Sequence, residues 1–329
     1  MAAVASHSPL GQRVPAWGRA ERSHMKVLDS FIENLYTGES VQVGQLKVTP
    51  VFIREEAALP YLEFEEALRR ELVEVTEVSE GGSVPNLFVN NKADRDVIIV
   101  DGELLVGAKQ NRVVNTTIVV PAHTSVEIPV TCVEQGRWRY TSRGFTSGDS
   151  HSYSSLRSLK HRTVTDSLRS TGSYTSDQSS IWGDIEAKMD RMASPSPTMS
   201  LSDVYESSVS REDEAQLEEE VKSQPGQVGY FAYVREGFAG GDVFGSSELC
   251  RAKLSKLLRG HYLDSLDTFI EFPRLTVEQV LGQLRDANPE QFASVGKGSE
   301  LRFEAAGVQG ACKLVDETIP HLAVFPKLN

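Results

Sequence analysis

The chain has 329 residues, of which 40% are hydrophobic and 24% charged, a composition close to that of folded globular proteins. Its 34 Lys and Arg against 46 Asp and Glu give a net charge of −12, which argues against a general role in holding nucleic acid. No stretch of the chain approaches the run of about 18 apolar residues that a membrane-spanning helix needs, so we expect no membrane span.

The chain divides by composition into a leader and one domain. Residues 1–24 contain Pro, Gly, Ser and three arginines but no apolar run, so we exclude them as a disordered leader or a non-native extension. We treat residues 25–329 as one domain. It comprises a β-rich part over 25–140, a helical and linker segment over 141–224, and a mixed α/β part over 225–329.

The β-rich part contains short β-branched runs between turn signals. We predict one helix here, over Glu56–Leu72, and strands over Val41–Val43, Leu46–Ile53, Leu87–Asn90, Val97–Val100, Glu103–Val106, Val113–Val120 and Val126–Val133. Asp101-Gly102 should form a tight hairpin, because this dipeptide tolerates positive φ angles, and Pro121-Ala122-His123 should link the last strand pair. Such strands predict a sandwich- or barrel-like half within an α+β fold.

The middle segment combines a flexible composition with helical periodicity. Residues 141–180 hold 19 Ser or Thr in 40 positions. Apolar residues nevertheless recur at helical spacing, which predicts two helices around a link at Thr171–Ser173, carried by Leu156, Leu159 and Leu168 and then by Ile181, Ile185 and Met189. Seven basic residues against two acidic ones give 137–169 a net +5, and eight acidic against two basic give 201–222 a net −6. These segments either pack together or form solvated faces.

The last third is predicted to alternate between strands and helices. We expect a strand at Val228–Val234, a Gly-rich loop at Gly237–Gly245, helices at Ser246–Leu258 and Thr276–Asp286, and an antiparallel meander of Leu301–Ala305, Ala311–Val315 and His321–Phe325. The glycines before the helix can cradle a phosphate, although Asp242 would repel it. A structural strand-to-helix turn explains the same pattern.

The densest polar run lies at Asp101–Arg112, followed by Asn115-Thr116-Thr117. Lys109, Gln110, Asn111 and Arg112 offer several donors within a short stretch, which suits a phosphate, a carboxylate or an amide-bearing ligand. The alternative is an exposed hairpin end whose amides bond within their own loop.

Cys132 and Glu134 are the other candidates for chemistry. Cys132 shares its strand face with apolar residues, so we predict a buried structural thiol rather than a nucleophile. Glu134 lies beside Arg137 and Trp138 and is either a general acid or base or the partner of Arg137. The three cysteines form no CxxC pair and the seven histidines no metal-ligating group, so we expect no metal, no cofactor and a reducing, cytoplasmic compartment.

From Asp101 to Trp138 the sequence resembles the ARG and rhodanese-phosphatase-superfamily-associated protein domain, a largely bacterial family. The resemblance extends from about Val27 to Phe325 and is carried by Gly107–Arg112, Cys132-Val133-Glu134 and Gly136-Arg137-Trp138, and more loosely by Asp242 and Phe244. It implies an association with ADP-ribosylglycohydrolase-type proteins and a role near ADP-ribose or related nucleotides.

These observations lead to one functional expectation and two rivals. We expect ADP-ribose or a related phosphorylated nucleotide to bind in the β-rich half, at Lys109, Gln110, Asn111, Arg112, Asn115, Arg137, Trp138 and Asp242. The first rival is a hydrolase acting on that ligand with Glu134 or Glu103 as base. The second is a protein-interaction module that uses the oppositely charged helices and has no small-molecule site.

Overall fold

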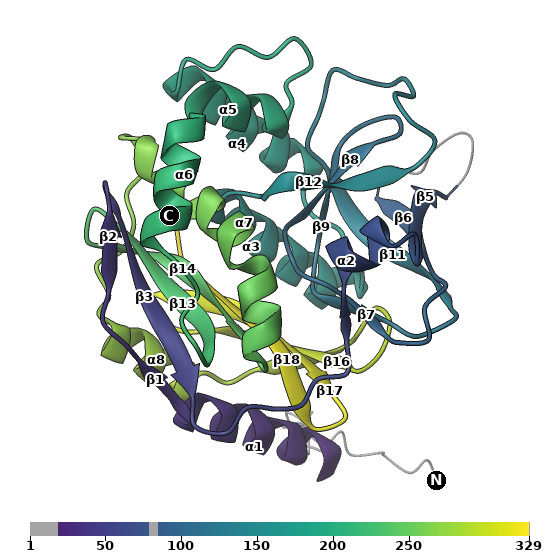
Figure 1. Cartoon of the computed structure of the whole chain (residues 1–329). Helices are drawn as coiled ribbons and strands as arrows, with labels where there is room; N and C mark the ends of the chain where they lie inside the picture. The colour runs from purple at the N-terminus through teal and green to yellow at the C-terminus, as the bar shows by residue number, and fades with distance from the viewer. Residues whose placement is uncertain (1–18, 79–84, 329) are drawn as a thin grey trace, which may run out of the picture.

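The computed structural model describes residues 19–78 and 85–328 and is an α+β protein with a large sheet, a β-rich half and helices between them (Figure 1). The large sheet has nine strands in the order β1-β3-β13-β14-β18-β17-β16-β15, with β2 paired to β3. Its strands are β1 Leu35–Thr37, β2 Val41–Val43, β3 Leu46–Ile53, β13 Gln227–Val234, β14 Gly237–Phe244, β15 Glu290–Ala293, β16 Ser299–Glu304, β17 Val308–Val315 and β18 Thr318–Pro326.

The β-rich half contains two smaller sheets. A six-stranded sheet has the order β12-β8-β9-β11-β6-β5, and a three-stranded sheet has the order β10-β7-β4. Their strands are β4 Leu62–Glu63, β5 Val73–Glu77, β6 Asn86–Asn91, β7 Val97–Ile99, β8 Glu103–Gly107, β9 Arg112–Val114, β10 Ile118–Val120, β11 Ser125–Cys132 and β12 Phe145–His151.

Helices cover both faces of the large sheet. One face packs against α1 Arg19–Glu33 and α8 Val277–Asp286 through an apolar cluster that includes Leu28, Val280 and Phe231. The other face packs against α7 Ser247–Leu266 and α3 Ser154–Thr171, which lie between it and the β-rich half (Figure 1). The remaining helices are α2 Phe64–Arg69, α4 Gln178–Arg191, α5 Leu201–Ser208 and α6 Arg211–Glu220.

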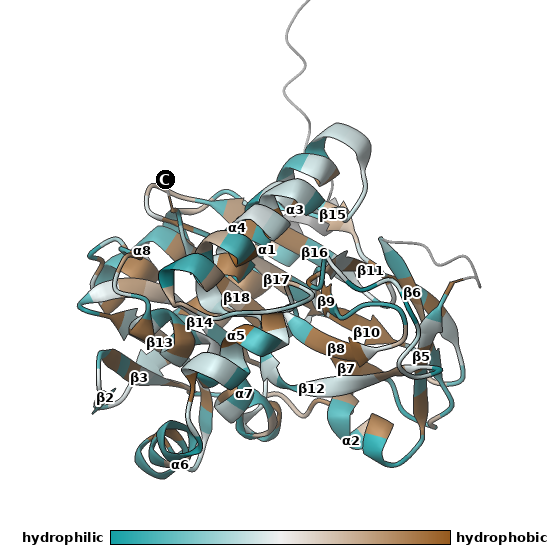
Figure 2. Cartoon of the chain, turned by 90° about the horizontal axis from the view of Figure 1, so that it is seen from above, coloured by the Kyte–Doolittle hydropathy of each residue, from teal (hydrophilic) through white to brown (hydrophobic). Residues whose placement is uncertain are grey.

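Hydropathy follows this layering. Apolar residues concentrate in the strands of both halves, whereas α6 is mostly hydrophilic (Figure 2). Among the described residues, no helix is both long and apolar enough to cross a membrane.

Several sequence predictions are confirmed. The serine-rich segment forms α3 and α4, and α3 ends at Gly172, whose φ of 73° provides a left-handed cap. Ser200, Ser246 and Thr276 accept hydrogen bonds from backbone amides at the starts of α5, α7 and α8. The meander β16-β17-β18 is antiparallel, but it extends the sheet that contains β3 and β13.

Other predictions are wrong for local reasons. Only Phe64–Arg69 is helical within Glu56–Leu72, because Pro60 disfavours helix and Leu62–Glu63 pairs with β7. Asp101-Gly102 turns the chain but forms no hairpin, since β7 pairs with β4 and β10 while β8 pairs with β9 and β12. Arg157 fills the space beside Gly102 at this corner.

Three further corrections concern two strands and the start of the chain. The predicted strand Val113–Val120 is interrupted at 115–117, and β11 pairs with β9 and β6 rather than with β10. The predicted Gly-rich loop is the strand β14, whose glycines admit close neighbours. Helix α1, which was not predicted, begins at Arg19 within the segment excluded above, of which residues 1–18 lie outside the described residues.

Candidate functional site

The sequence-predicted site residues are divided among separate buried clusters. Lys109, Gln110, Asn111 and Arg112 are between 0% and 8% exposed, so they do not form an exposed hairpin end. Glu134 and Arg137 join Asn111, whereas Glu103 and Asp242 lie in two other clusters described below. The structure therefore brings some of the predicted residues together, but not all of them into one pocket.

The first group is the Glu134 cluster, formed by Asn111, Glu134, Arg137 and Thr198. Arg137 donates to Glu134 from Nε at 2.8 Å and from Nη2 at 2.6 Å, and the Asn111 backbone amide donates to the same carboxylate at 3.0 Å. Thr198 adds a fourth hydrogen bond at 3.0 Å. Burial opposes ionisation of Glu134, but these bonds hold its pKa below the usual value. The carboxylate is thus fixed as an ionised acceptor.

Gln110, Arg112 and Cys132 form an adjoining contact. Arg112 Nη1 donates to Gln110 Oε1 at 2.9 Å, and the Cys132 thiol donates to the same oxygen at 3.2 Å. The Nε and Nη2 atoms of Arg112 are buried without a hydrogen-bond partner in the described structure. Burial raises the pKa of Cys132, which agrees with the prediction of a structural thiol.

The remaining residues of this region are also held by neighbours. Lys109 Nζ lies 5.2 Å from the ring centroids of both Trp138 and Tyr140, an arrangement typical of cation–π contacts. Asn115 donates to the Tyr174 carbonyl at 2.8 Å and accepts from Thr131. Trp138 is 49% exposed, so the predicted region reaches the surface at its aromatic end.

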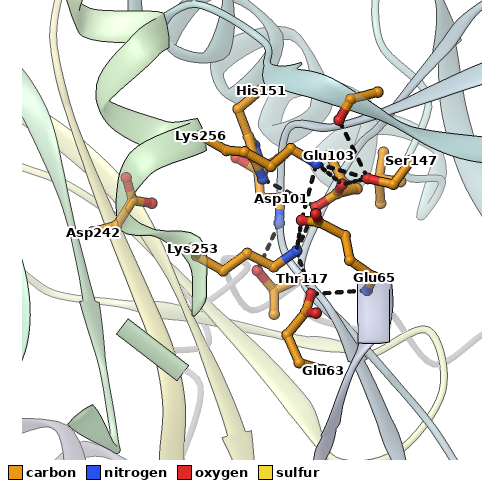
Figure 3. Close-up of polar contacts among 12 residues, drawn as sticks. Glu63, Glu65, Asp101, Glu103, Thr117, Ser147, His151, Asp242, Lys253 and Lys256 are labelled. Carbon is orange, nitrogen blue, oxygen red and sulfur yellow. Dashed lines mark hydrogen bonds and ion pairs between the residues drawn. The ribbon is translucent and has the colours of Figure 1, made fainter. Parts of the chain in front are cut away.

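The second group, the Glu103 cluster, lies where β8 meets α7 (Figure 3). Lys253 Nζ is 2.9 Å from Glu103 and 2.8 Å from Glu65, and it also contacts Glu63; Lys256 Nζ is 2.7 Å from Glu103. Burial opposes ionisation of Glu103, but the charges of Lys253 and Lys256 hold its pKa well below the usual range. A general base works best with a pKa near the operating pH, and this carboxylate is shifted the other way.

The third group, the Asp242 cluster, lies in β14 and α3. Arg157 donates to both Asp242 oxygens at 2.7 and 2.8 Å, Tyr230 donates at 2.7 Å, and His321 Nε2 lies at 3.1 Å. Thr117 bonds the other ring nitrogen of His321 at 2.7 Å. Burial opposes ionisation of Asp242, but Arg157 holds its pKa well below the usual range. Asp242 is therefore a buried anchor for α3 and not the phosphate-facing residue of a loop.

The central carboxylates of these clusters, Glu134, Glu103 and Asp242, are buried and their charges are compensated by neighbouring basic side chains. Among the described residues, no group of three or more His, Cys, Asp and Glu side chains is arranged to hold a metal ion. A ligand of nucleotide size needs an open cavity instead.

A cavity of about 600 Å³ lies between α3, α4, the segment that follows α7 and the C-terminal residues. We call it the α3–α4 cavity. Its volume is within the range of small-molecule sites. Three basic side chains, two acidic ones and two phenylalanines line it together with serine and glutamine: Arg162, Arg191, Lys327, Asp184, Glu271, Phe269, Phe272, Ser155, Ser158 and Gln309.

The residues that α3 contributes to the cavity lie on one face of the helix. Ser155, Ser158, Leu159 and Arg162 occupy positions i, i+3, i+4 and i+7 and therefore share one face. Arg162 Nη1 donates to the Leu328 carbonyl at 3.3 Å, and among the described residues Arg162 forms no ion pair. Phe269 is 71% exposed at the cavity, on a segment whose carbonyls accept hydrogen bonds from Arg235.

Other cavities suit an anionic ligand less well. One of about 620 Å³ lies against α2, β5 and β12, where Glu65, Glu71 and Glu74 outnumber Arg69 and Lys92. Neither this cavity nor the α3–α4 cavity is lined by residues 109–112. Sequence reasoning therefore missed the α3–α4 cavity. The sequence features that could have indicated this cavity are the basic run over 137–169 and the two phenylalanines within 269–272.

The fold is that of an α+β protein in which helices lie between two β structures, and a cavity lined by three basic and two acidic side chains opens beside α3 and α4. The chain belongs to the family of the ARG and Rhodanese-Phosphatase-superfamily-associated Protein domain, whose profile matches residues 34–325. This match confirms the family resemblance. No curated protein and no solved structure matches the chain.

Proposed function

We propose that this protein binds ADP-ribose or a related phosphorylated nucleotide in the α3–α4 cavity. The observation that carries the proposal is the combination of three basic side chains and an exposed phenylalanine around about 600 Å³ of open volume. A nucleotide joins an anionic phosphate chain to a flat aromatic base, so its recognition requires both features.

The basic residues differ in how far they are already engaged. Arg191 contacts Asp267 at 2.9 Å and Lys327 contacts Glu304 at 3.3 Å, whereas Arg162 bonds only a carbonyl in the described structure. Arg162 is therefore the side chain best able to form charge-assisted bonds with a phosphate. Phe269 supplies a platform on which an adenine ring can stack.

The family name supports the same ligand class, because it records an association with ADP-ribosylglycohydrolases. We assign Glu103 and Glu134 no proton-transfer role in this proposal, since both are paired carboxylates with lowered pKa values. The proposal is therefore one of binding rather than hydrolysis.

The interaction-module alternative has less support. Basic residues of 137–169 pair outside the acidic segment 201–222: Arg157 pairs with Asp242, and Arg169 with Glu290 and Glu304. The two charged segments therefore do not neutralise each other through these pairs.

Isothermal titration calorimetry with ADP-ribose, NAD and AMP tests the proposal. We expect saturable binding of ADP-ribose with one site per chain. Arg162→Ala should weaken it by about tenfold or more, because a charge-assisted hydrogen bond contributes roughly 1.5–3 kcal/mol. Arg251→Ala, at an exposed α7 position outside the cavity lining, is the control and should bind like the unsubstituted chain. Equal weakening by both substitutions, or no binding by the unsubstituted chain, would contradict the proposal.

A further inference from the structure

Asp184 is an acidic side chain in the wall of the cavity assigned above to an anionic ligand. It lies on α4 and is only partly covered, and the Tyr153 hydroxyl donates to its Oδ2 at 2.7 Å. No described residue donates a hydrogen bond to Oδ1. One oxygen is therefore fixed by the protein while the other remains available at the cavity.

The charged neighbours of Asp184 do not pair with it directly. Lys188 on the same helix lies 2.6 Å from Asp264 and 3.3 Å from Asp267, and Arg191 lies 2.9 Å from Asp267. Burial raises the pKa of Asp184. Burial also acts to raise the pKa of Asp267, but the hydrogen bond from Arg191 outweighs burial and the pKa of Asp267 is lowered. The basic groups on α4 are thus committed to α7 and its C-terminal cap, and not to Asp184.

An uncommitted carboxylate would repel a phosphate that entered the same cavity. Its position is compatible with a nucleotide only if the ligand part that reaches it carries hydrogen-bond donors. In a ribonucleotide these donors are the 2′- and 3′-hydroxyls of the sugar, and a carboxylate is a good acceptor for such a pair.

We propose that Asp184 accepts hydrogen bonds from the hydroxyls of the nucleoside ribose and makes the cavity selective for ribonucleotides over 2′-deoxyribonucleotides. This inference rests on the proposed function. It assigns different walls to different ligand parts: Arg162 to the phosphates, Phe269 to the base and Asp184 to the sugar. Glu271 also lines the cavity, but it is exposed on the segment after α7.

The test compares two ligands by calorimetry: ADP-ribose and an analogue that lacks the 2′-hydroxyl of its adenosine. The unsubstituted chain should bind ADP-ribose about tenfold more tightly than the analogue. Asp184→Ala should reduce this ratio to less than about twofold, mainly by weakening ADP-ribose. Asp184→Asn, which keeps an acceptor for Tyr153, serves as the variant that preserves local structure and should also reduce the ratio.

Glu186→Gln, at an exposed position of α4 outside the cavity lining, is the matched control and should keep the tenfold ratio. Equal binding of both ligands by the unsubstituted chain, or an unchanged tenfold affinity ratio in both Asp184 variants, would overturn the role of Asp184. Either result would leave the proposed binding of ADP-ribose intact. Failure of the unsubstituted chain to bind ADP-ribose overturns the proposed function instead.

Discussion

Arg112 lies fully buried with two of its three guanidinium nitrogens unbonded in the described structure. Arg137 is also buried, but it holds the Glu134 carboxylate with two hydrogen bonds. The two arginines therefore differ in what their loss leaves behind. Removing a buried unpaired cation relieves its desolvation cost, whereas removing one member of a buried pair strands the other charge.

We predict that Arg112→Met leaves the free energy of unfolding unchanged or raises it by up to about 2 kcal/mol, because methionine fills a similar volume without a charge. Arg137→Met should lower it by roughly 3–5 kcal/mol by leaving Glu134 unpaired. Urea unfolding measures both. A loss of several kcal/mol in Arg112→Met would show that the unbonded nitrogens have a partner that stabilises the fold.

Buried histidines give a second prediction at this scale. Burial lowers the pKa of His151 and of His261 to about 4, and it lowers the pKa of His161 well below the usual value. In the unfolded chain a histidine titrates near about 6.5, so between pH 6.5 and 4 the unfolded state binds more protons. Stability should therefore fall as the pH is lowered through this window.

Urea unfolding at pH 7 and pH 5 measures this effect. Each histidine with a folded pKa of about 4 contributes a decrease on the order of 2 kcal/mol at pH 5. His151→Gln should make the decrease smaller by about that amount, and His123→Gln, at an exposed position, should leave it unchanged. A decrease that persists in full without His151 would mean that this ring is already charged in the folded protein.

The predicted site residues show what sequence can and cannot specify at this scale. Four adjacent polar side chains at 109–112 suggested a ligand site or an exposed hairpin end, but the structure buries all four, whereas strand parity correctly placed Cys132 in the interior. The partners of Glu103 and Asp242 come from α7 and α3, about 150 and 85 residues away along the chain. The spacing of residues along the chain gives no indication of ion pairs between residues so far apart in sequence.

At the scale of elements, β14 depends on glycine for close packing. A Cβ on Gly241 would lie 2.5 Å from the Tyr230 carbonyl oxygen and 2.6 Å from a Phe231 ring carbon. Gly241→Ala should therefore destabilise the protein by roughly 1–3 kcal/mol. Gly282→Ala in α8 meets nothing within 4 Å and should stabilise it by about 0.5–1 kcal/mol. Thermal unfolding distinguishes them, and a neutral Gly241→Ala would contradict the described packing.

Elements with local signals were predicted well, and elements set by tertiary pairing were not. Helices α3, α4 and α8 follow from apolar periodicity and capping residues. Residues 237–244 were predicted as a loop because glycine is unfavourable in strands. They form strand β14 through pairing with β13 and β18. Tertiary pairing also explains why Asp101-Gly102 forms no hairpin, because the strands before and after it belong to different sheets.

At the scale of the whole molecule, α3 joins the two β structures. Arg157 contacts Asp242 in the large sheet and Asp101 in the β-rich half, and Lys160 also contacts Asp101. Another face of the same helix carries Ser155, Ser158 and Arg162, which line the α3–α4 cavity. The helix that holds the halves together therefore also builds the proposed site.

The most direct test of the account is a crystal structure of the chain grown with ADP-ribose. We expect ligand density in the α3–α4 cavity, with a phosphate near Arg162, the adenine against Phe269 and a ribose hydroxyl within hydrogen-bond distance of Asp184. Density at the surface near Lys109 and Trp138, or an empty cavity in crystals saturated with the ligand, would contradict it.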